Sequence, residues 1–154
     1  MAQQGRRRRM DGCLRYATEE DMDLLYRFVN DGEVRKQAFS SRPIRYEEHR
    51  AWYGRLLGRT DARQYIYMYD KEAIGQIRVE IKGDAGEIDY SISRAWRGNG
   101  HGRKMLLLLK EQVKTDFPEV KRLYGRVKTE NLASQSAFQS AGFKEVFRRY
   151  EYSM

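Results

Sequence analysis

The feature that most constrains this chain is a glycine-rich loop. Residues 91–104 place Gly98, Gly100 and Gly102 between a stretch typical of a strand and a stretch typical of a helix. Glycine has no Cβ, so the backbone can approach a ligand closely and can adopt positive φ angles. The first amides of a helix have no partners within the helix, and the helix dipole favours an anion beside them. We therefore expect the loop to hold a phosphate or pyrophosphate group.

Two common phosphate-binding loops do not fit this segment. The Walker pattern ends in Gly-Lys-Ser/Thr, and this loop has no such ending. The dinucleotide pattern G-x-G-x-x-G, counted from Gly98, would require glycine where Arg103 stands, and it belongs to a parallel βαβ unit, whereas an antiparallel hairpin is expected here. The remaining pattern is Arg-x-x-Gly-x-Gly, formed by Arg97, Gly100 and Gly102. A glycine-rich turn that binds no ligand is the alternative.

The periodicity of the rest of the chain predicts a single mixed α/β domain in the order β-α-α-β-β-β-α-β-α-β. Apolar residues recur every second residue in the expected strands and every third or fourth in the expected helices. Lys71 and Glu72 are expected to form the turn between the second and third strands. The predicted strands are 13–17, 64–69, 73–81, 87–93, 123–128 and 143–152. Four helices are predicted. The first begins after Thr18 and ends near residues 30–32, the second spans 46–57, the third follows the glycine loop and ends before Pro118, and the fourth spans 132–141.

Length and composition limit the classes of protein. A chain of 154 residues fits one domain, and we expect residues 1–12 to be a flexible basic tail before a domain of residues 13–154. The single cysteine, Cys13, excludes an internal disulfide and is expected in the core. Two histidines cannot assemble a recognisable zinc cluster, so no metal is expected. No apolar run approaches the roughly 20 residues of a membrane span, and a cytoplasmic location fits best.

The net charge of +8 suits a polyanionic partner, either nucleic acid or a phosphate-bearing cofactor. Four of these charges belong to Arg6–Arg9, which leaves +4 for the rest of the chain. No nucleic-acid reading motif accompanies them, so nucleic acid is not the expected partner. A nucleic-acid-binding module that uses Arg6–Arg9 stays as an alternative.

The loop and the element order resemble the GCN5-related N-acetyltransferases (GNAT), over residues 14–152. The segment from Asn131 to Phe143 is similar to a second signature of that family, a helix that begins at asparagine and ends in Gly-Phe. The resemblance implies a mostly antiparallel sheet that is splayed at the acyl-CoA site and flanked by helices. It also implies acetyl transfer from acetyl-CoA to a primary amine by direct attack in a ternary complex. The residues implied in cofactor binding are Ile92, Ser93, Arg97, Gly98, Asn99, Gly100, His101, Gly102, Arg103, Asn131 and Ser134, with a plain helix N-cap as the alternative for Asn131.

Acetyl transfer needs a neutral amine and a leaving thiolate. A lysine-like amine has a pKa of about 10.4, so a general base helps. Glu87 is the candidate base, because several GNAT enzymes place a glutamate where this strand begins, and Asp89 is the second candidate. Many relatives have a tyrosine proton donor where Phe138 stands. Either Tyr90 or Tyr150 therefore protonates the thiolate, or it leaves unassisted.

The N-terminal half resembles the GNAT branch of amino-sugar acetyltransferases, which includes the enzyme type of pseudaminic acid synthesis. The similarity is carried by Asn30-Asp31, Val34-Arg35 and Glu48-His49-x-x-Trp52. Arg35 and His49 are expected to contact the phosphates and rings of a nucleotide-linked amino sugar, with a surface histidine as the alternative for His49. Two further functional alternatives stay open: a ribosomal-type protein N-terminal acetyltransferase and a CoA-binding relative without catalysis. Whether the chain forms a homodimer also stays open.

Overall fold

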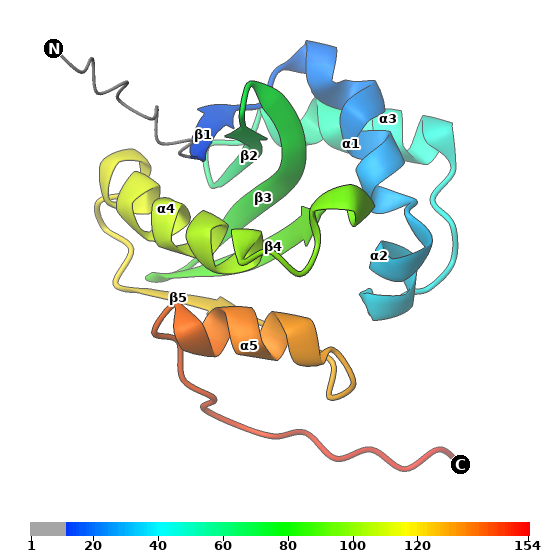
Figure 1. Ribbon diagram of the computed structural model, residues 1–154, viewed down its shortest axis with the longest axis vertical. Coiled ribbons are helices and arrows are strands. Elements are labelled where there is room, and N and C mark those ends of the chain that lie inside the picture. The colour runs from blue at the N-terminus through cyan, green and yellow to red at the C-terminus, as the bar shows by residue number, and fades with distance from the viewer. Residues whose placement is uncertain (1–11) are drawn as a thin grey trace, which may run out of the picture.

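A computed structural model describes residues 12–154, and Arg6–Arg9 of the expected tail lie outside the described residues. Five strands form one sheet in the order β1-β2-β3-β4-β5, in which only β4 and β5 run parallel (Figure 1). The mixed α/β fold with a mostly antiparallel sheet is confirmed. The strands are β1 (Cys13–Tyr16), β2 (Ala62–Tyr69), β3 (Glu72–Lys82), β4 (Ala85–Ile92) and β5 (Arg122–Gly125); the helices are α1 (Met22–Val29), α2 (Gly32–Gln37), α3 (Tyr46–Leu57), α4 (His101–Asp116) and α5 (Leu132–Ser140).

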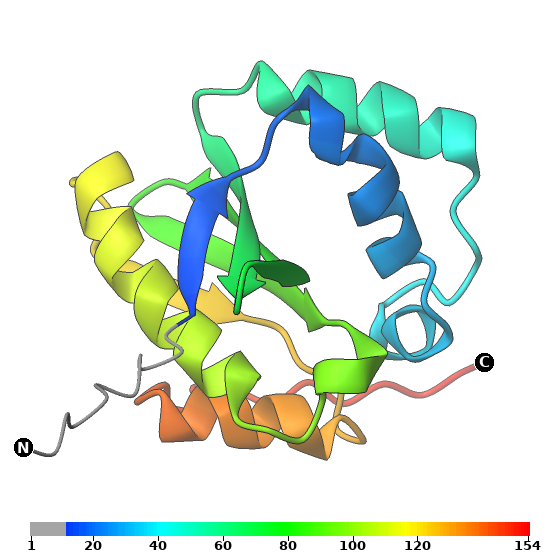
Figure 2. The same ribbon diagram turned by 45° about the horizontal axis from the view of Figure 1, so that its top comes forward.

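Helices cover both faces of the sheet. Figures 1 and 2 show α4 across one face and α1 with α3 against the other. Alternation along β2 divides its side chains between the two layers, because successive residues of a strand point to opposite faces. Tyr67 packs with Leu106 of α4 in one buried cluster, whereas Ile66 packs with Leu25 of α1 and Tyr53 of α3 in the other.

Two local predictions need correction. The sequence does not predict α2, because Asn30-Asp31-Gly32 is typical of the end of a helix. Asp31 instead caps a new helix by accepting hydrogen bonds from the backbone N–H groups of Glu33 and Val34. The turn between β2 and β3 is formed by Asp70 and Lys71, both with positive φ, one residue earlier than expected.

The predicted last strand, 143–152, does not form. The segment leaves the end of α5 and runs beneath it without strand pairing (Figure 1). Phe143 packs against the core, but the later apolar side chains are exposed, namely Val146, Phe147, Tyr150 and Tyr152. Alternation in a sequence specifies two side-chain faces, but a strand also needs a neighbouring backbone edge, and pairing within the described residues does not supply one.

Cys13 is exposed rather than in the core, because β1 is an edge strand whose side chains are mostly exposed. Among residues 12–154, no helix is both long and apolar enough to cross a membrane.

Candidate active site

The glycine loop is held open by its own backbone geometry. Gly98 and Gly100 both have a φ of 78°, which side-chain-bearing L residues rarely adopt, and Gly100 is the N-cap of α4. The Asn99 side chain turns back and donates hydrogen bonds to the carbonyl oxygens of Trp96 and Arg97, at 3.3 and 3.0 Å. The loop therefore leads directly into the first amides of α4, the part of a helix that favours an anion.

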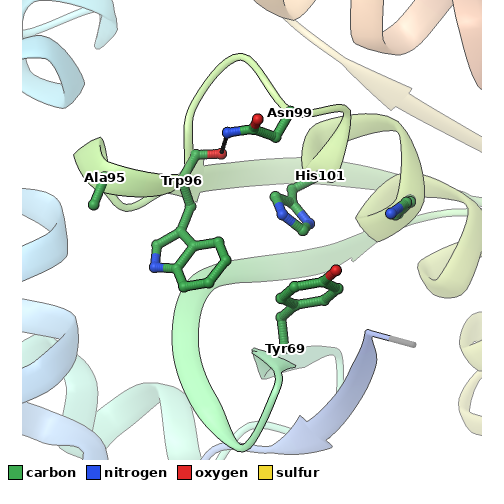
Figure 3. Close-up of a pocket in the computed structure, with 6 residues that line it drawn as sticks. Tyr69, Ala95, Trp96, Asn99 and His101 are labelled. Atoms are coloured by element: carbon green, nitrogen blue, oxygen red, sulfur yellow. Dashed lines mark hydrogen bonds between the residues drawn. The ribbon is translucent and has the colours of Figure 1, made fainter. Parts of the chain in front are cut away.

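His101 points away from the mouth of this loop. Its side chain is 4% exposed and lies beneath the loop, facing Tyr69 and Trp96 (Figure 3). The Nδ1 atom is 3.0 Å from the Tyr67 hydroxyl. Burial, with a smaller effect of Lys104, lowers the pKa of His101 below its ordinary value. Only the backbone of His101 is thus presented to a phosphate at the loop; its ring lines a shallow cavity of about 410 Å³ behind it.

Arg97 ties the end of β4 to the corner between α1 and α2. Its Nε donates to the carbonyl oxygen of Ile92 at 2.9 Å, and its Nη2 donates to Asp31 at 2.8 Å. Burial, the largest single effect, would raise the pKa of Asp31, but the hydrogen bonds from Arg97 and from the first amides of α2 hold it below its ordinary value. Asp31 is therefore an ionised carboxylate that fixes Arg97.

The end of β4 has an unpaired edge. Pairing with β5 stops at Ile88 and Gly125, and among residues 12–154 no strand continues beside residues 89–92 on that side. The N–H of Ser93 donates to Ile74 of β3, so the backbone groups of Ile92, one residue earlier, point away from β3. The Ile92 carbonyl oxygen accepts from Arg97, and its N–H faces the unpaired edge. An extended ligand with its own amide groups can bind such an edge as a further strand would.

Helix α5 approaches the unpaired end of β4. Asn131 is its N-cap and accepts a hydrogen bond from the Ser134 N–H at 3.1 Å. The Tyr90 hydroxyl reaches across from β4 and donates to the Ser134 hydroxyl oxygen at 3.1 Å. Burial raises the pKa of Tyr90, so its hydroxyl keeps its proton at neutral pH. Gly102 permits α4 to approach α5 closely, because a Cβ at Gly102 would lie 3.2 Å from the Cβ of Ala137.

The two candidate bases have different surroundings. Glu87 lies in the part of β4 that pairs with β5, and it forms salt bridges with Lys82 at 2.9 Å and Arg126 at 3.1 Å. Burial acts to raise the pKa of Glu87, but Lys82 and Arg126 together hold it below its ordinary value. Asp89 lies beside the unpaired edge and is 59% exposed, with Arg78 3.7 Å away.

Not every residue expected at the site lies near the glycine loop and the end of β4. His49 is buried between α1 and α3, where its Nε2 is 3.1 Å from the Met22 carbonyl oxygen. Arg35 uses its guanidinium to bind the carbonyl oxygens of residues 29, 40 and 42. Tyr150 is 86% exposed on the C-terminal segment. Sequence spacing could not show these positions, because those of His49 and Arg35 depend on how α1, α2 and α3 pack, and that of Tyr150 depends on the path of the C-terminal segment.

Sequence reasoning also missed two residues next to Asp89. Gln76 donates hydrogen bonds to Asp89 and to Ser91, at 3.3 and 3.2 Å. The polar alternation of β3 did carry a signal, since it placed Gln76 opposite the apolar face, but the register to β4 was needed to find its partners. Within residues 12–154, no group of three or more His, Cys, Asp or Glu side chains is placed to hold a metal ion.

Comparisons with known proteins bear on the family and the fold of the chain. The family profile described as "Acetyltransferase (GNAT) domain" matches residues 13–144. A search of curated protein sequences finds no match.

Several solved structures have a similar fold at low sequence identity. The aminoglycoside acetyltransferase AAC(6')-Ib with paromomycin and acetyl-CoA has a TM-score of 0.77 and 22% identity, with 87% of this chain and 83% of that chain covered. The spermidine N-acetyltransferase of Vibrio cholerae with CoA and spermine has a TM-score of 0.79 and 18% identity, covering 89% and 83%. The ribosomal L7/L12 N-terminal acetyltransferase RimL with CoA has a TM-score of 0.76 and 19% identity, covering 90% and 84%.

Proposed function

Because the chain belongs to the GNAT acetyltransferase family, and is thus an acyltransferase that uses acetyl-CoA, we propose that its acceptor is a small primary amine that also carries phosphate, such as a nucleotide-linked amino sugar. The observation that carries this proposal is the charge of the surface around Asp89. Four carboxylates on or near this side of β3 and β4 already have basic partners: Asp31 with Arg97, Glu80 with Arg59, Glu87 with Lys82 and Arg126, and Asp89 with Arg78.

A polycationic acceptor would need carboxylates that are not already neutralised. The guanidinium of Arg35 contacts only carbonyl oxygens in its hydrogen bonds, so it adds a positive charge near Asp89. Arg78 lies over the ring of Trp52, 4.9 Å from the ring centroid, and this contact fixes its position. An acceptor with a phosphate group is attracted by this surface, whereas spermine or an aminoglycoside is repelled.

The residues of the gap between β4 and α5 fit the expected co-substrate. The loop amides at the start of α4 suit a pyrophosphate, and the unpaired backbone of β4 suits an extended arm with amide groups. When bound, acetyl-CoA supplies the acetyl thioester. Asn131 and Ser134 lie at the start of α5, and the Tyr90 hydroxyl of β4 donates to the Ser134 hydroxyl oxygen.

Asp89 is the better base of the two candidates. Two cations hold Glu87 ionised, and it lies in the closed part of β4, so it is poorly placed to take a proton from an amine. Asp89 is exposed beside the unpaired edge. We assign proton removal from the amine to Asp89 and protonation of the thiolate to Tyr90, whose raised pKa keeps the proton available.

Thiol release from acetyl-CoA tests the acceptor class. A nucleotide-linked amino sugar should be acetylated with a kcat/KM at least about tenfold above that of the same sugar without phosphate, because each matched charge contributes on the order of 1 kcal/mol. This preference should shrink as salt is raised. A preference for spermine, an aminoglycoside or a ribosomal peptide would contradict the proposed class.

Two matched variants test the base. Asp89→Asn should lower kcat by about 10²- to 10⁴-fold and leave the KM for acetyl-CoA nearly unchanged. Glu87→Gln should lower the melting temperature but change kcat by no more than about threefold, since its salt bridges are structural. The opposite result would return the role of base to Glu87.

A further inference from the structure

A buried pair of glutamine side chains lies under the surface that carries Asp89. Gln64 of β2 is 3% exposed and Gln76 of β3 is 8% exposed. Buried amides are costly unless they form hydrogen bonds, and apolar side chains would fill this space at lower cost. The pair therefore calls for a role other than packing.

The orientation of both amides follows from their neighbours. The Nε2 of Gln64 lies 3.3 and 3.2 Å from the backbone carbonyl oxygens of Tyr65 and Ile77, which can only accept hydrogen bonds. The same NH₂ group is 2.7 Å from the Gln76 side chain, so the Gln76 atom there must be its oxygen. The NH₂ group of Gln76 must then face Asp89 and Ser91, at 3.3 and 3.2 Å.

We infer that Gln76 is a positioning residue that holds the Asp89 carboxylate and the Ser91 hydroxyl at the unpaired edge of β4. This inference rests on the proposed function of Asp89. Gln76 gives one hydrogen to each partner, so both are fixed by one rigid amide. Since the oxygen of the buried Ser91 hydroxyl accepts from Gln76, its proton is directed away from the Gln76 amide.

Several charged groups also face Asp89. Arg78 of β3 is 3.7 Å away. Burial lowers the pKa of the Arg35 guanidinium of α2, and the charge of Asp89 acts to raise it. Glu87 is on the same face of β4 but is neutralised by Lys82 and Arg126. Arg78 attracts the carboxylate without directing it, because the distance exceeds that of a hydrogen bond. Gln76 thus forms the directional contact with Asp89.

The decisive variant is Gln76→Glu. One oxygen of the new carboxylate can still accept from Gln64, so the buried pair is kept, while the other now faces Asp89. Two carboxylates at hydrogen-bond distance cannot both ionise freely, so the acid limb of the kcat/KM profile should move up by about one pH unit or more. Gln76→Met, similar in shape but without the amide, should lower kcat about tenfold. Gln139→Glu, exposed on α5, makes the same change of charge away from Asp89 and should leave the profile in place.

The experiment measures thiol release from acetyl-CoA against pH for each variant, with the full chain, and records the melting temperature in parallel. A Gln76→Glu profile that matches the wild type, with a lowered melting temperature, would overturn the positioning role and leave only packing. Asp89→Asn separates the two hypotheses. If it retains full activity, the proposed base is wrong; if it is inactive while Gln76→Glu and Gln76→Met behave as wild type, only the inference about Gln76 fails.

Discussion

Replacing Asp31 should separate two contributions of this side chain to the free energy of unfolding: the helix cap and the ion pair. Asp31 caps α2, accepting from the N–H groups of Glu33 and Val34 at 3.1 and 3.3 Å, and it pairs with Arg97 at 2.8 Å. Loss of an N-cap costs about 1 kcal/mol, and a half-buried, hydrogen-bonded ion pair contributes about 1 kcal/mol. Asp31→Ala should therefore cost about 2 kcal/mol of the free energy of unfolding. Asp31→Asn keeps a good cap and should cost about 1 kcal/mol.

Thermal unfolding measures this difference directly. For a domain of this size, 1 kcal/mol corresponds to about 3 °C, so the melting temperature should fall by about 6 °C for Asp31→Ala and about 3 °C for Asp31→Asn. Equal losses in the two variants would show that the cap contributes nothing. A double-mutant cycle of Asp31→Asn with Arg97→Gln should give a coupling of about 1 kcal/mol, and strict additivity would refute the ion pair.

The contribution of Asp31 to stability should depend on pH in a defined direction. The pKa of Asp31 is lowered in the folded protein, so its contribution is present above the unfolded value of about 3.9 and is lost as the pH falls through the folded value. The gap in stability between the wild type and Asp31→Asn should therefore close below about pH 4. A gap that widens there would contradict the assignment.

Three further predictions concern single sites. Gly125→Ala should lower the free energy of unfolding, measured in urea, by about 3 kcal/mol or more, because the new Cβ would overlap the ring of Phe138. A second change, Phe138→Leu, should recover part of this loss. If it recovers nothing, the strain lies elsewhere. Gly100→Ala should cost about 1–2 kcal/mol of the free energy of unfolding and raise the KM for acetyl-CoA, because the φ of Gly100 is 78°. The control is Gly54→Ala, in the middle of α3 with open space around it, which should be neutral or stabilising. Burial lowers the pKa of His49, so the unfolded chain takes up a proton more readily and stability should fall as the pH drops below about 6.5; His49→Gln should reduce this slope in melting temperatures recorded from pH 7.5 to 5.

The sequence by itself determined the class of fold and the place of the glycine loop. Both depend on local properties: alternation marks β2, β3 and β4, and glycines between a strand and a helix mark an anion site. The bounds of α3 were predicted to the residue, because its amphipathic stripe and its terminal Gly58 are both local signals. The N-cap role of Asn131, kept as an alternative, is also a local property, and its hydrogen bond to Ser134 is present.

Only the tertiary structure decided which side chains meet. It placed His49 in the core, Tyr150 on an exposed segment and Glu87 between two cations, and it brought Gln76 to Asp89. The absence of a strand over residues 143–152 is of the same kind, since pairing depends on a partner edge that the segment itself does not encode. Local patterns specify the element and the face of each residue, whereas the side chains that surround Asp89 depend on the register between neighbouring strands.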